Sequence, residues 1–453
     1  MASCRLWRQG LRRVARVQEV LHGRVDRPGR HRGARRPAPW TGGRGRRRPR
    51  GVPRMPVSAM HAPPRALPPV AARVDAALVE LDRQIDWLLA LSPIDNDGAW
   101  EAFEASGFRQ APPLRYIDLE IDLDEARQRL DALPLDDIES PLLSGLLSEK
   151  QRELERHLQL VRLRGTEGFV NASLDLFGGV DAGLRALADE ILASVPHGAP
   201  LVADAGIDEV VEAVEAELEW YRGRAGDFKA DVVVDTDIGS MMMVSHGTFY
   251  VDGGIRLPRA RVQPLVQHEI GTHVVTRYNG GHQPLRQLEV GLAHYDALQE
   301  GLGVLAEYLA GYLPGDRLRV LAARVVAVDM AVAGEGIPEI HACLRETHGL
   351  PTNEAFDIAV RALRGGGLTK DAVYLSGLRD LLDHLHAGGE LGPLLRGKFA
   401  LSHLPVVDRL EEEGWAVPPA LMPRYAHDDG FADRLQCCRD TGIADFFHME
   451  PRA

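Results

Sequence analysis

Residues 268–273 read HEIGTH, so two histidines lie five positions apart in a segment whose pattern is otherwise helical. An α-helix turns by about 100° per residue, and a separation of five therefore points His268 and His273 about 140° apart. A locally widened turn with i→i+5 hydrogen bonds, or a break after His268, would bring both imidazoles onto one face. Gly271 lies inside this turn and eases such a distortion. The sequence thus predicts a distorted helix over 260–277 if the two histidines act together.

A carboxylate further along the chain completes a donor set that suits zinc. Residues 299–302 read QEGL, and Glu300 lies there in an apolar helical pattern, where a charge is costly to bury without a partner. Two imidazoles and one carboxylate can hold a catalytic zinc ion and leave one position open for water. His268, His273 and Glu300 are therefore the candidate ligands, with an arginine as the alternative partner of Glu300. Glu269 is placed to take a proton from a water that Zn²⁺ acidifies.

Several further motifs accompany these two segments. They are Arg164-Gly165-Thr166, Phe169, Ser173, Gly178, Asn279-Gly280, Gln283-Pro284-Leu285, Arg364-Gly365-Gly366-Gly367, Thr369-Lys370-Asp371 and Tyr374. Together the motifs resemble the bacterial QEGLA-motif proteins, a family described as flavohemoglobin expression-modulating and related to the eukaryotic microtubule-associated tyrosine carboxypeptidases. The resemblance runs from roughly Val74 to Tyr425. One departure is Gly303, where the family signature usually has alanine.

The resemblance implies a zincin-like metallopeptidase, and above all a carboxypeptidase that releases a C-terminal residue from a peptide or protein. It implies one Zn²⁺ held by His268, His273 and Glu300, with Glu269 as the general base that activates the zinc-bound water. Two rivals stay open at this point. One is another zinc-dependent peptidase, such as an aminopeptidase, and the other is a non-catalytic regulator of gene expression, which the family description suggests.

Other polar residues near the motifs have more than one interpretation. Glu307 falls on the same helix face as Glu300, so it is the carboxylate ligand itself, a hydrogen-bonding partner behind the ligands, or a solvated charge. His282 and His294 lie between the two motifs and are alternative ligands. We expect these two histidines to be surface or hydrogen-bonded residues outside the site.

A carboxypeptidase also needs a cation that binds the terminal carboxylate of its substrate. Arg277, four residues after His273, is one candidate, and Lys370 and Arg364 are others. For each of them an ordinary salt bridge is the plainer interpretation. Tyr374 lies four residues after Lys370 and is a candidate for stabilising the oxyanion.

Hydrophobic periodicity predicts an α+β fold that is mostly α-helical, with a small β-sheet directly before the zinc-binding helix. Predicted strands cover 231–235, 243–246 and 248–251, where an exposed edge could pair with an extended substrate or form a structural hairpin. Asn279-Gly280-Gly281 is predicted to be a turn, and Gly365-Gly366-Gly367 a helix breaker. The predicted helices are 71–91, 123–135, 140–163, 181–194, 207–222, 260–277, 285–313, 317–333, 337–347, 353–363, 369–385 and 404–413.

The N-terminal region differs in composition from the rest of the chain. Its first 54 residues hold 17 arginines against two acidic residues, whereas the whole chain has a net charge of −12. This basic arm could bind phosphate backbones, act as a targeting peptide, or come from a mis-called start upstream of Met55 or Met60. We favour the mis-called start, because only four of the 53 basic residues are lysine, as in GC-rich coding sequences. Nucleic acid is therefore not expected as a partner.

The predicted domains are a disordered arm over 1–65, a helical scaffold over 66–222, a metallopeptidase core over 223–425 that is integrated with it, and a tail over 426–453. No stretch of about 18 apolar residues is present to span a membrane, and no signal-peptide core precedes the scaffold. A cytoplasmic location is expected. The oligomeric state is open.

Overall fold

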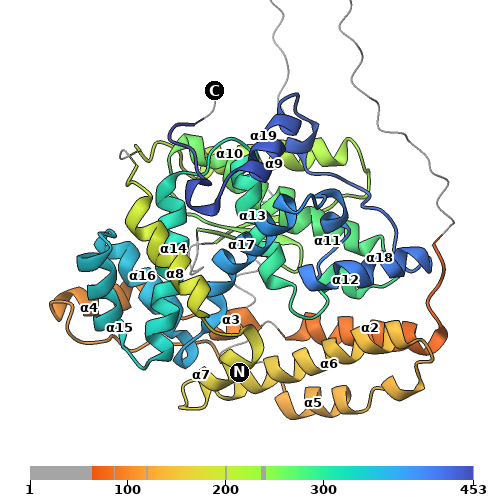
Figure 1. Cartoon of the computed structure of the whole chain (residues 1–453). Coiled ribbons are helices and arrows are strands. Elements are labelled where there is room, and N and C mark those ends of the chain that lie inside the picture. Colours follow the sequence, from red (N-terminus) through yellow and green to blue (C-terminus); the bar gives the residue numbers. More distant parts are fainter. Residues whose placement is uncertain (1–63, 86, 119–120, 199–200, 236–240, 452–453) are drawn as a thin grey trace, which may run out of the picture. The chain divides into compact units, whose positions relative to one another are not determined.

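The computed structural model describes residues 64–85, 87–118, 121–198, 201–235 and 241–451, and nearly all of the basic arm lies outside them. Residues 62–453 group as one compact unit. Its described part is mostly helical with one three-stranded sheet, which confirms the predicted mostly α-helical α+β class (Figure 1). Within the described ranges, no helix combines the length and apolarity that crossing a bilayer requires. The division of this unit at 222 and 425 stays a prediction.

The first half of the unit is a set of amphipathic helices, most of them where the periodicity predicts them. The longest of these helices has Ser140 at its N-cap and Pro141 at its first position, two residues that are favoured there. The Ser140 hydroxyl accepts a hydrogen bond from the Leu143 amide. The predicted single helix 71–91 is wrong, because the backbone leaves helical geometry at Ile85 (φ −99°, ψ 81°). The elements are α2 (Pro69–Gln84), α3 (Trp87–Leu91), α4 (Asn96–Ala105), α5 (Leu123–Asp131), η1 (Leu135–Asp137), α6 (Pro141–Arg162), α7 (Phe169–Phe177), α8 (Ala182–Ser194) and α9 (Ile207–Arg222).

The sheet consists of β1 (Asp231–Asp235), β2 (Met242–Ser245) and β3 (Thr248–Asp252), close to the predicted strands. Its order is β1-β3-β2, with β1 parallel and β2 antiparallel to β3. Phe249 and Val251 on β3 are fully buried and share a core with α9 and with the helix that follows the sheet. The sheet therefore supports that helix from one side.

The helices that carry the two motifs follow the sheet: α10 (Arg259–His268), the π-helix η2 (Glu269–Val274), α11 (Val275–Gly281), α12 (Gln287–Val290) and α13 (Asp296–Leu309). The predicted turn at Asn279-Gly280-Gly281 is wrong, since these residues continue α11. The predicted helix 285–313 is also wrong as one piece. Gly291 (φ 128°) and His294 (φ 59°) adopt left-handed backbone conformations between α12 and α13, which no helix accommodates.

The last third of the unit is again helical. The predicted breaker at Gly365-Gly366-Gly367 is confirmed, because all three glycines have positive φ after α16 ends. Part of the predicted tail is ordered: Phe446 is fully buried and stacks on Tyr308 at 4.1 Å between ring centroids. The elements are α14 (Gly315–Val332), α15 (Ile337–Ala342), the π-helix η3 (Cys343–Thr347), α16 (Thr352–Leu363), η4 (Arg364–Gly366), η5 (Thr369–Ala372), α17 (Val373–His386), η6 (Gly392–Leu395), η7 (Leu401–His403), α18 (Leu404–Glu412), η8 (Arg424–His427), α19 (Phe431–Asp440) and η9 (Ile443–Asp445).

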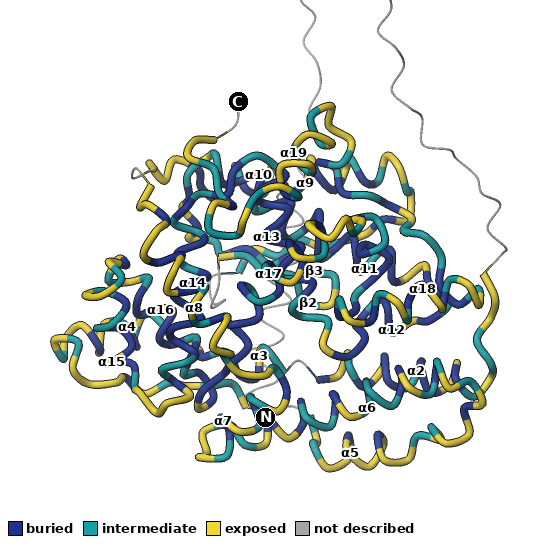
Figure 2. The backbone as a smooth tube through the Cα atoms, viewed as in Figure 1, coloured by how far each residue is buried: buried dark blue, intermediate teal, exposed yellow. Residues whose placement is uncertain are grey.

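Helix α13 packs along α17, and the tube of α13 is buried over most of its length (Figures 1 and 2). The two backbones meet at glycines. A Cβ atom on Gly301 would lie 2.6 Å from the carbonyl of Gly377, and one on Gly377 would lie 1.8 Å from the carbonyl oxygen of Ala297. Glycine at both positions therefore lets the segment with Lys370 and Tyr374 approach the helix that carries Glu300.

This contact gives a stability prediction. Gly377→Ala is expected to lower the free energy of unfolding by about 3 kcal/mol, because the added methyl group meets a backbone carbonyl that cannot turn away. Gly145→Ala is the matched control, since it lies in α6 with no atom within 4 Å of the added Cβ. That control should gain roughly 0.5–1 kcal/mol. Urea denaturation compares the three proteins, and a Gly377→Ala chain as stable as its parent would contradict the close approach.

A buried aspartate fixes the start of α12. The carboxylate of Asp75 accepts hydrogen bonds from the backbone amides of Arg286 (2.9 Å) and Gln287 (3.0 Å), and its side chain is 1 % exposed. Burial raises the pKa of Asp75 from 3.8 to about 6, although the two amides oppose this rise. The interaction joins α2 to α12 across more than 200 residues of sequence.

Asp75 consequently predicts a pH dependence of stability. A carboxyl whose pKa is raised in the folded state contributes stability that is complete below pH 3.8 and is lost as the pH rises through about 6. Between pH 4.5 and pH 7, the unfolding free energy of the parent should therefore fall by about 2 kcal/mol relative to Asp75→Ala. Denaturant titrations of both proteins at these pH values measure it. A difference between the two proteins that stays constant over this range would contradict the shifted pKa.

Candidate metal centre

The first half of the site is a widened helical turn. η2 is a π-helix that begins directly after His268 and contains His273. The Val275 amide donates to the carbonyl of Ile270, five residues earlier, which is the i→i+5 bond that the histidine spacing requires. A Cβ on Gly271 would lie 2.5 Å from the Gln267 side-chain oxygen, so glycine leaves room for that side chain in the turn. The predicted distortion is confirmed.

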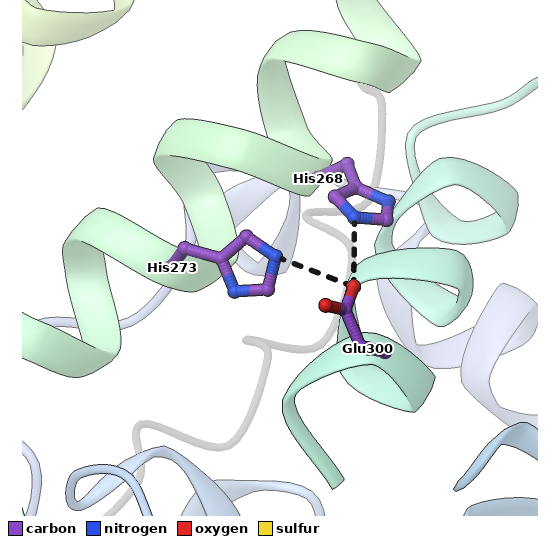
Figure 3. Close-up of side chains that lie close together, drawn as sticks. All are labelled: His268, His273 and Glu300. Carbon is purple, nitrogen blue, oxygen red and sulfur yellow. Dashed lines mark ion pairs between the residues drawn. The ribbon is translucent and has the colours of Figure 1, made fainter. Parts of the chain in front are cut away.

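The widened turn brings three donor side chains together (Figure 3). Nε2 of His268 lies 3.7 Å and Nε2 of His273 lies 3.8 Å from the same Glu300 oxygen, Oε2. One ligand atom from each residue lies within 4.8 Å of the others. Ligands about 2.1 Å from a tetrahedral zinc ion are about 3.4 Å apart, so this donor set fits the metal in chemistry and in spacing. Both imidazoles come from the segment after the sheet, and the carboxylate comes from α13.

Glu307 is a partner of His268 behind the donor triad. Its side chain is fully buried and accepts from Nδ1 of His268 (2.9 Å), Arg261 (2.5 Å) and Arg317 (3.3 Å). Burial alone would raise the pKa of Glu307, but the two arginines hold it well below its usual range. An ionised Glu307 orients the His268 ring with Nδ1 as the donor, which leaves Nε2 directed at Glu300.

The two imidazoles differ in charge. Burial lowers the pKa of His268, but its hydrogen bonds to Glu300 and Glu307 outweigh this and raise it to about 10. Burial lowers the pKa of His273 to about 3, so this ring is neutral, as a metal ligand must be. Two carboxylates thus enclose one imidazole, and a cation at Nε2 of His268 would offset their charge.

The partner behind His268 gives a testable prediction. Glu307→Gln is expected to weaken Zn²⁺ binding about 10- to 100-fold, because the amide removes the charge that orients His268. Glu217→Gln is the matched control, since Glu217 is also fully buried and pairs with Arg424 at 3.1 Å away from the donor triad. Competition with a fluorescent chelator measures both affinities, and circular dichroism checks folding. Equal Zn²⁺ affinity in a folded Glu307→Gln chain would contradict this role.

Glu269 follows the first histidine and begins the π-helix. Burial raises the pKa of its carboxyl to about 7, with His268 opposing and the charges of Glu300 and Glu307 adding to the rise. Its carboxylate accepts no hydrogen bond from any residue that the structure describes. A carboxyl with these properties can accept and return a proton near neutral pH.

The structure brings Lys370 and Tyr374 to the triad. Nζ of Lys370 lies 3.0 Å from Asp296 and 3.3 Å from Glu300, so its charge helps to keep Glu300 ionised despite burial. The centroid of the Tyr374 ring lies 5.7 Å from Nζ of Lys370 and 5.0 Å from the guanidinium carbon of Arg324. Burial and the nearby Glu300 raise the pKa of Tyr374, so its hydroxyl keeps its proton.

Other predicted residues have partners away from the triad. Arg277 pairs with Glu289 at 2.7 Å, and Arg364 lies 3.5 Å from Asp371. His282 bonds to Asp227 and the Tyr278 carbonyl, and His294 lies 4.0 Å from Glu149. Both histidines thus lie outside the triad, as expected.

Sequence reasoning missed two residues of the site. Gln299 accepts a hydrogen bond from Thr276 (2.7 Å) and lies 3.5 Å from Nδ1 of His273, which orients the second imidazole. Gln299 directly precedes Glu300 in the second motif, and this position could have identified it as a site residue. Lys398 lies far along the chain, and its charge lowers the pKa of His273. No local motif marks this lysine.

Gly303 lies beside the first imidazole. A Cβ at this position would come within 2.6 Å of Cε1 and Nε2 of the His268 ring. The glycine that departs from the resembled signature therefore makes room for the ring position seen here.

Comparison with protein-family models identifies a family for the chain. The family model described as microtubule-associated tyrosine carboxypeptidase matches residues 101–441, which include the whole donor triad and the segment of Lys370 and Tyr374. No curated protein matches the chain.

Proposed function

The chain belongs to the microtubule-associated tyrosine carboxypeptidase family, and from this premise we propose that it is a zinc-dependent carboxypeptidase that releases a C-terminal residue. Tyrosine is the first terminal residue to test, because the family description names it. The observation that carries the zinc dependence is the approach of two imidazoles and one carboxylate within 4.8 Å. The π-helix η2, which contains His273, contacts the edge strand β2, and this arrangement also supports a zincin-like core.

In this proposal His268, His273 and Glu300 hold the ion. When bound, Zn²⁺ would polarise the scissile carbonyl and acidify a water molecule beside it. Glu269 takes a proton from the water whose oxygen attacks the scissile carbonyl carbon. It passes this proton to the amine nitrogen as the C–N bond breaks. Tyr374 keeps its proton and can donate a hydrogen bond to the developing oxyanion.

The proposal also bears on the cations that the sequence offers as partners of the substrate's terminal carboxylate. Lys370 already pairs with Asp296 and Glu300, so it acts on the substrate through the position and charge of Glu300. Arg277 pairs with Glu289 at 2.7 Å, so in this proposal its charge serves the fold. Arg364, the third candidate, lies 3.5 Å from Asp371. We therefore infer that a cation other than these three binds the substrate's terminal carboxylate.

The test uses peptides that end in tyrosine, with either the N-terminus acetylated or the C-terminus amidated. Release of free tyrosine from the acetylated peptide but not from the amide, lost on chelation and restored by Zn²⁺, supports the carboxypeptidase. Release of the first residue from the amidated peptide would show an aminopeptidase instead. A chain that binds no Zn²⁺ and cleaves neither peptide would overturn the proposal.

A further inference from the structure

Three cations near the donor triad contact carboxylates: Lys370 lies 3.0 Å from Asp296, Arg317 lies 3.3 Å from Glu307, and Arg361 lies 2.5 Å from Asp371. A fourth cation, Lys398, lies over the ring of Tyr295, directly before the helix of Glu300.

Lys398 differs from the other three. Across the described ranges, no carboxylate oxygen lies within 4.0 Å of its Nζ atom. The residue is nevertheless half-buried, and burial, followed by the charge of Arg277, lowers its pKa to about 8. The charges of Asp296, Glu300 and Asp82 act on Lys398 in the opposite direction but do not outweigh its burial. A partly buried ammonium that no carboxylate contacts directly is unfavourable, and an anion brought by a ligand would offset this cost.

The backbone fixes Lys398 beside the helix of Glu300. Its amide donates to the Leu288 carbonyl (2.8 Å) and its carbonyl accepts from the Leu292 amide (2.9 Å), so the residue adjoins the connection between α12 and α13. Its Nζ lies 5.7 Å from the ring centroid of Tyr295, directly before α13. The main chain of Lys398 is thus fixed beside the connection that leads into α13, and its ammonium lies over the Tyr295 ring at the start of that helix.

Lys150 lies over the same tyrosine ring as Lys398 but has a structural role. Nζ of Lys150 lies 5.9 Å from the same Tyr295 ring, but it also contacts Asp82 at 3.0 Å and Glu153 at 2.9 Å. Its charge is neutralised within the fold. In the part of the chain that the structure describes, Lys398 has no carboxylate at such a distance, although it lies over the same ring. This difference indicates that the anion that pairs with Lys398 belongs to a ligand.

We propose that Lys398 binds the α-carboxylate of the substrate's C-terminal residue. The inference rests on the proposed function and adds the group that recognises a chain end. An ammonium at the start of the helix that carries Glu300 can form a charge-assisted hydrogen bond to this carboxylate while the preceding peptide bond lies at the metal site. An amidated chain end has no such charge and loses the interaction.

The test measures binding rather than turnover. The Glu269→Gln chain is loaded with Zn²⁺, and calorimetry compares an N-acetylated peptide ending in tyrosine with its C-terminal amide. We expect the free acid to bind about 10- to 100-fold more tightly than the amide. Lys398→Met in the same background should abolish this preference, and Lys398→Arg should keep most of it. Lys229→Met, at an exposed lysine, is the matched control and should leave the preference unchanged.

The outcomes separate the two proposals. A preference for the acid that survives Lys398→Met, with normal Zn²⁺ content and folding, overturns the role of Lys398 and leaves the carboxypeptidase intact. A Glu269→Gln chain without any preference also overturns it. Tyrosine release by the chain with Glu269 in place is scored separately and tests the proposed function alone.

Discussion

Glu269→Gln is expected to slow peptide hydrolysis by about three orders of magnitude while Zn²⁺ content stays at the parental level. The substitution keeps the size of the side chain and removes its ability to take a proton. Because Glu269 is not one of the three grouped donors, its loss should not release the ion. Stopped assays of tyrosine release, beside metal analysis of the same samples, measure both quantities.

Glu217→Gln serves again as the control for this substitution, because it neutralises a buried carboxylate outside the site. It should retain full activity. Hydrolysis by the Glu269→Gln chain at a rate close to that of the parent would rule out Glu269 as the base. Loss of Zn²⁺ together with activity would instead make Glu269 a ligand.

Removing one donor of the triad is expected to empty the metal site. His268→Ala and Glu300→Ala should each reduce bound Zn²⁺ from about one ion per chain to a small fraction, because two remaining donors hold zinc poorly. Activity should fall below detection in both. Elemental analysis after dialysis against a weak chelator gives the stoichiometry.

His282→Ala is the matched control for these ligand variants. His282 lies between the two motifs in sequence but bonds to Asp227 and the Tyr278 carbonyl. Its replacement should leave the metal content unchanged. Parental Zn²⁺ levels in the His268→Ala and Glu300→Ala chains would show that the donor triad is not the metal site.

The centre of the site was predictable because its geometry is local. A five-residue histidine spacing in a helical segment has few solutions, and the π-helix over Glu269–Val274 is one of them. The nearness of Glu300 to both imidazoles followed from its motif and from the resemblance. Glu307 was also accessible, because a seven-residue separation returns to the same helix face.

What could not be predicted depends on contacts between distant segments. The break before α13 involves His294, whose amide donates to Glu153 more than 100 residues earlier. Among the described residues, Lys398 has no carboxylate in direct contact because Lys370, Arg317 and Arg361 pair with the carboxylates near the site. No sequence pattern predicts how these partners are distributed. The pairing of Arg277 with Glu289 is of the same kind.

The widened turn is also clamped downstream. The side-chain amide of Asn279 donates to the carbonyls of Leu395 and Leu421 and accepts from the Leu421 amide. Deleting one residue inside η2 would restore ordinary helical winding, but it would swing Asn279 by about 100° away from these partners. The extra residue in η2 and the hydrogen bonds of Asn279 therefore depend on each other. Evolution or design can shorten this helix to the usual histidine spacing only if the segments around Leu395 and Leu421 are rebuilt at the same time.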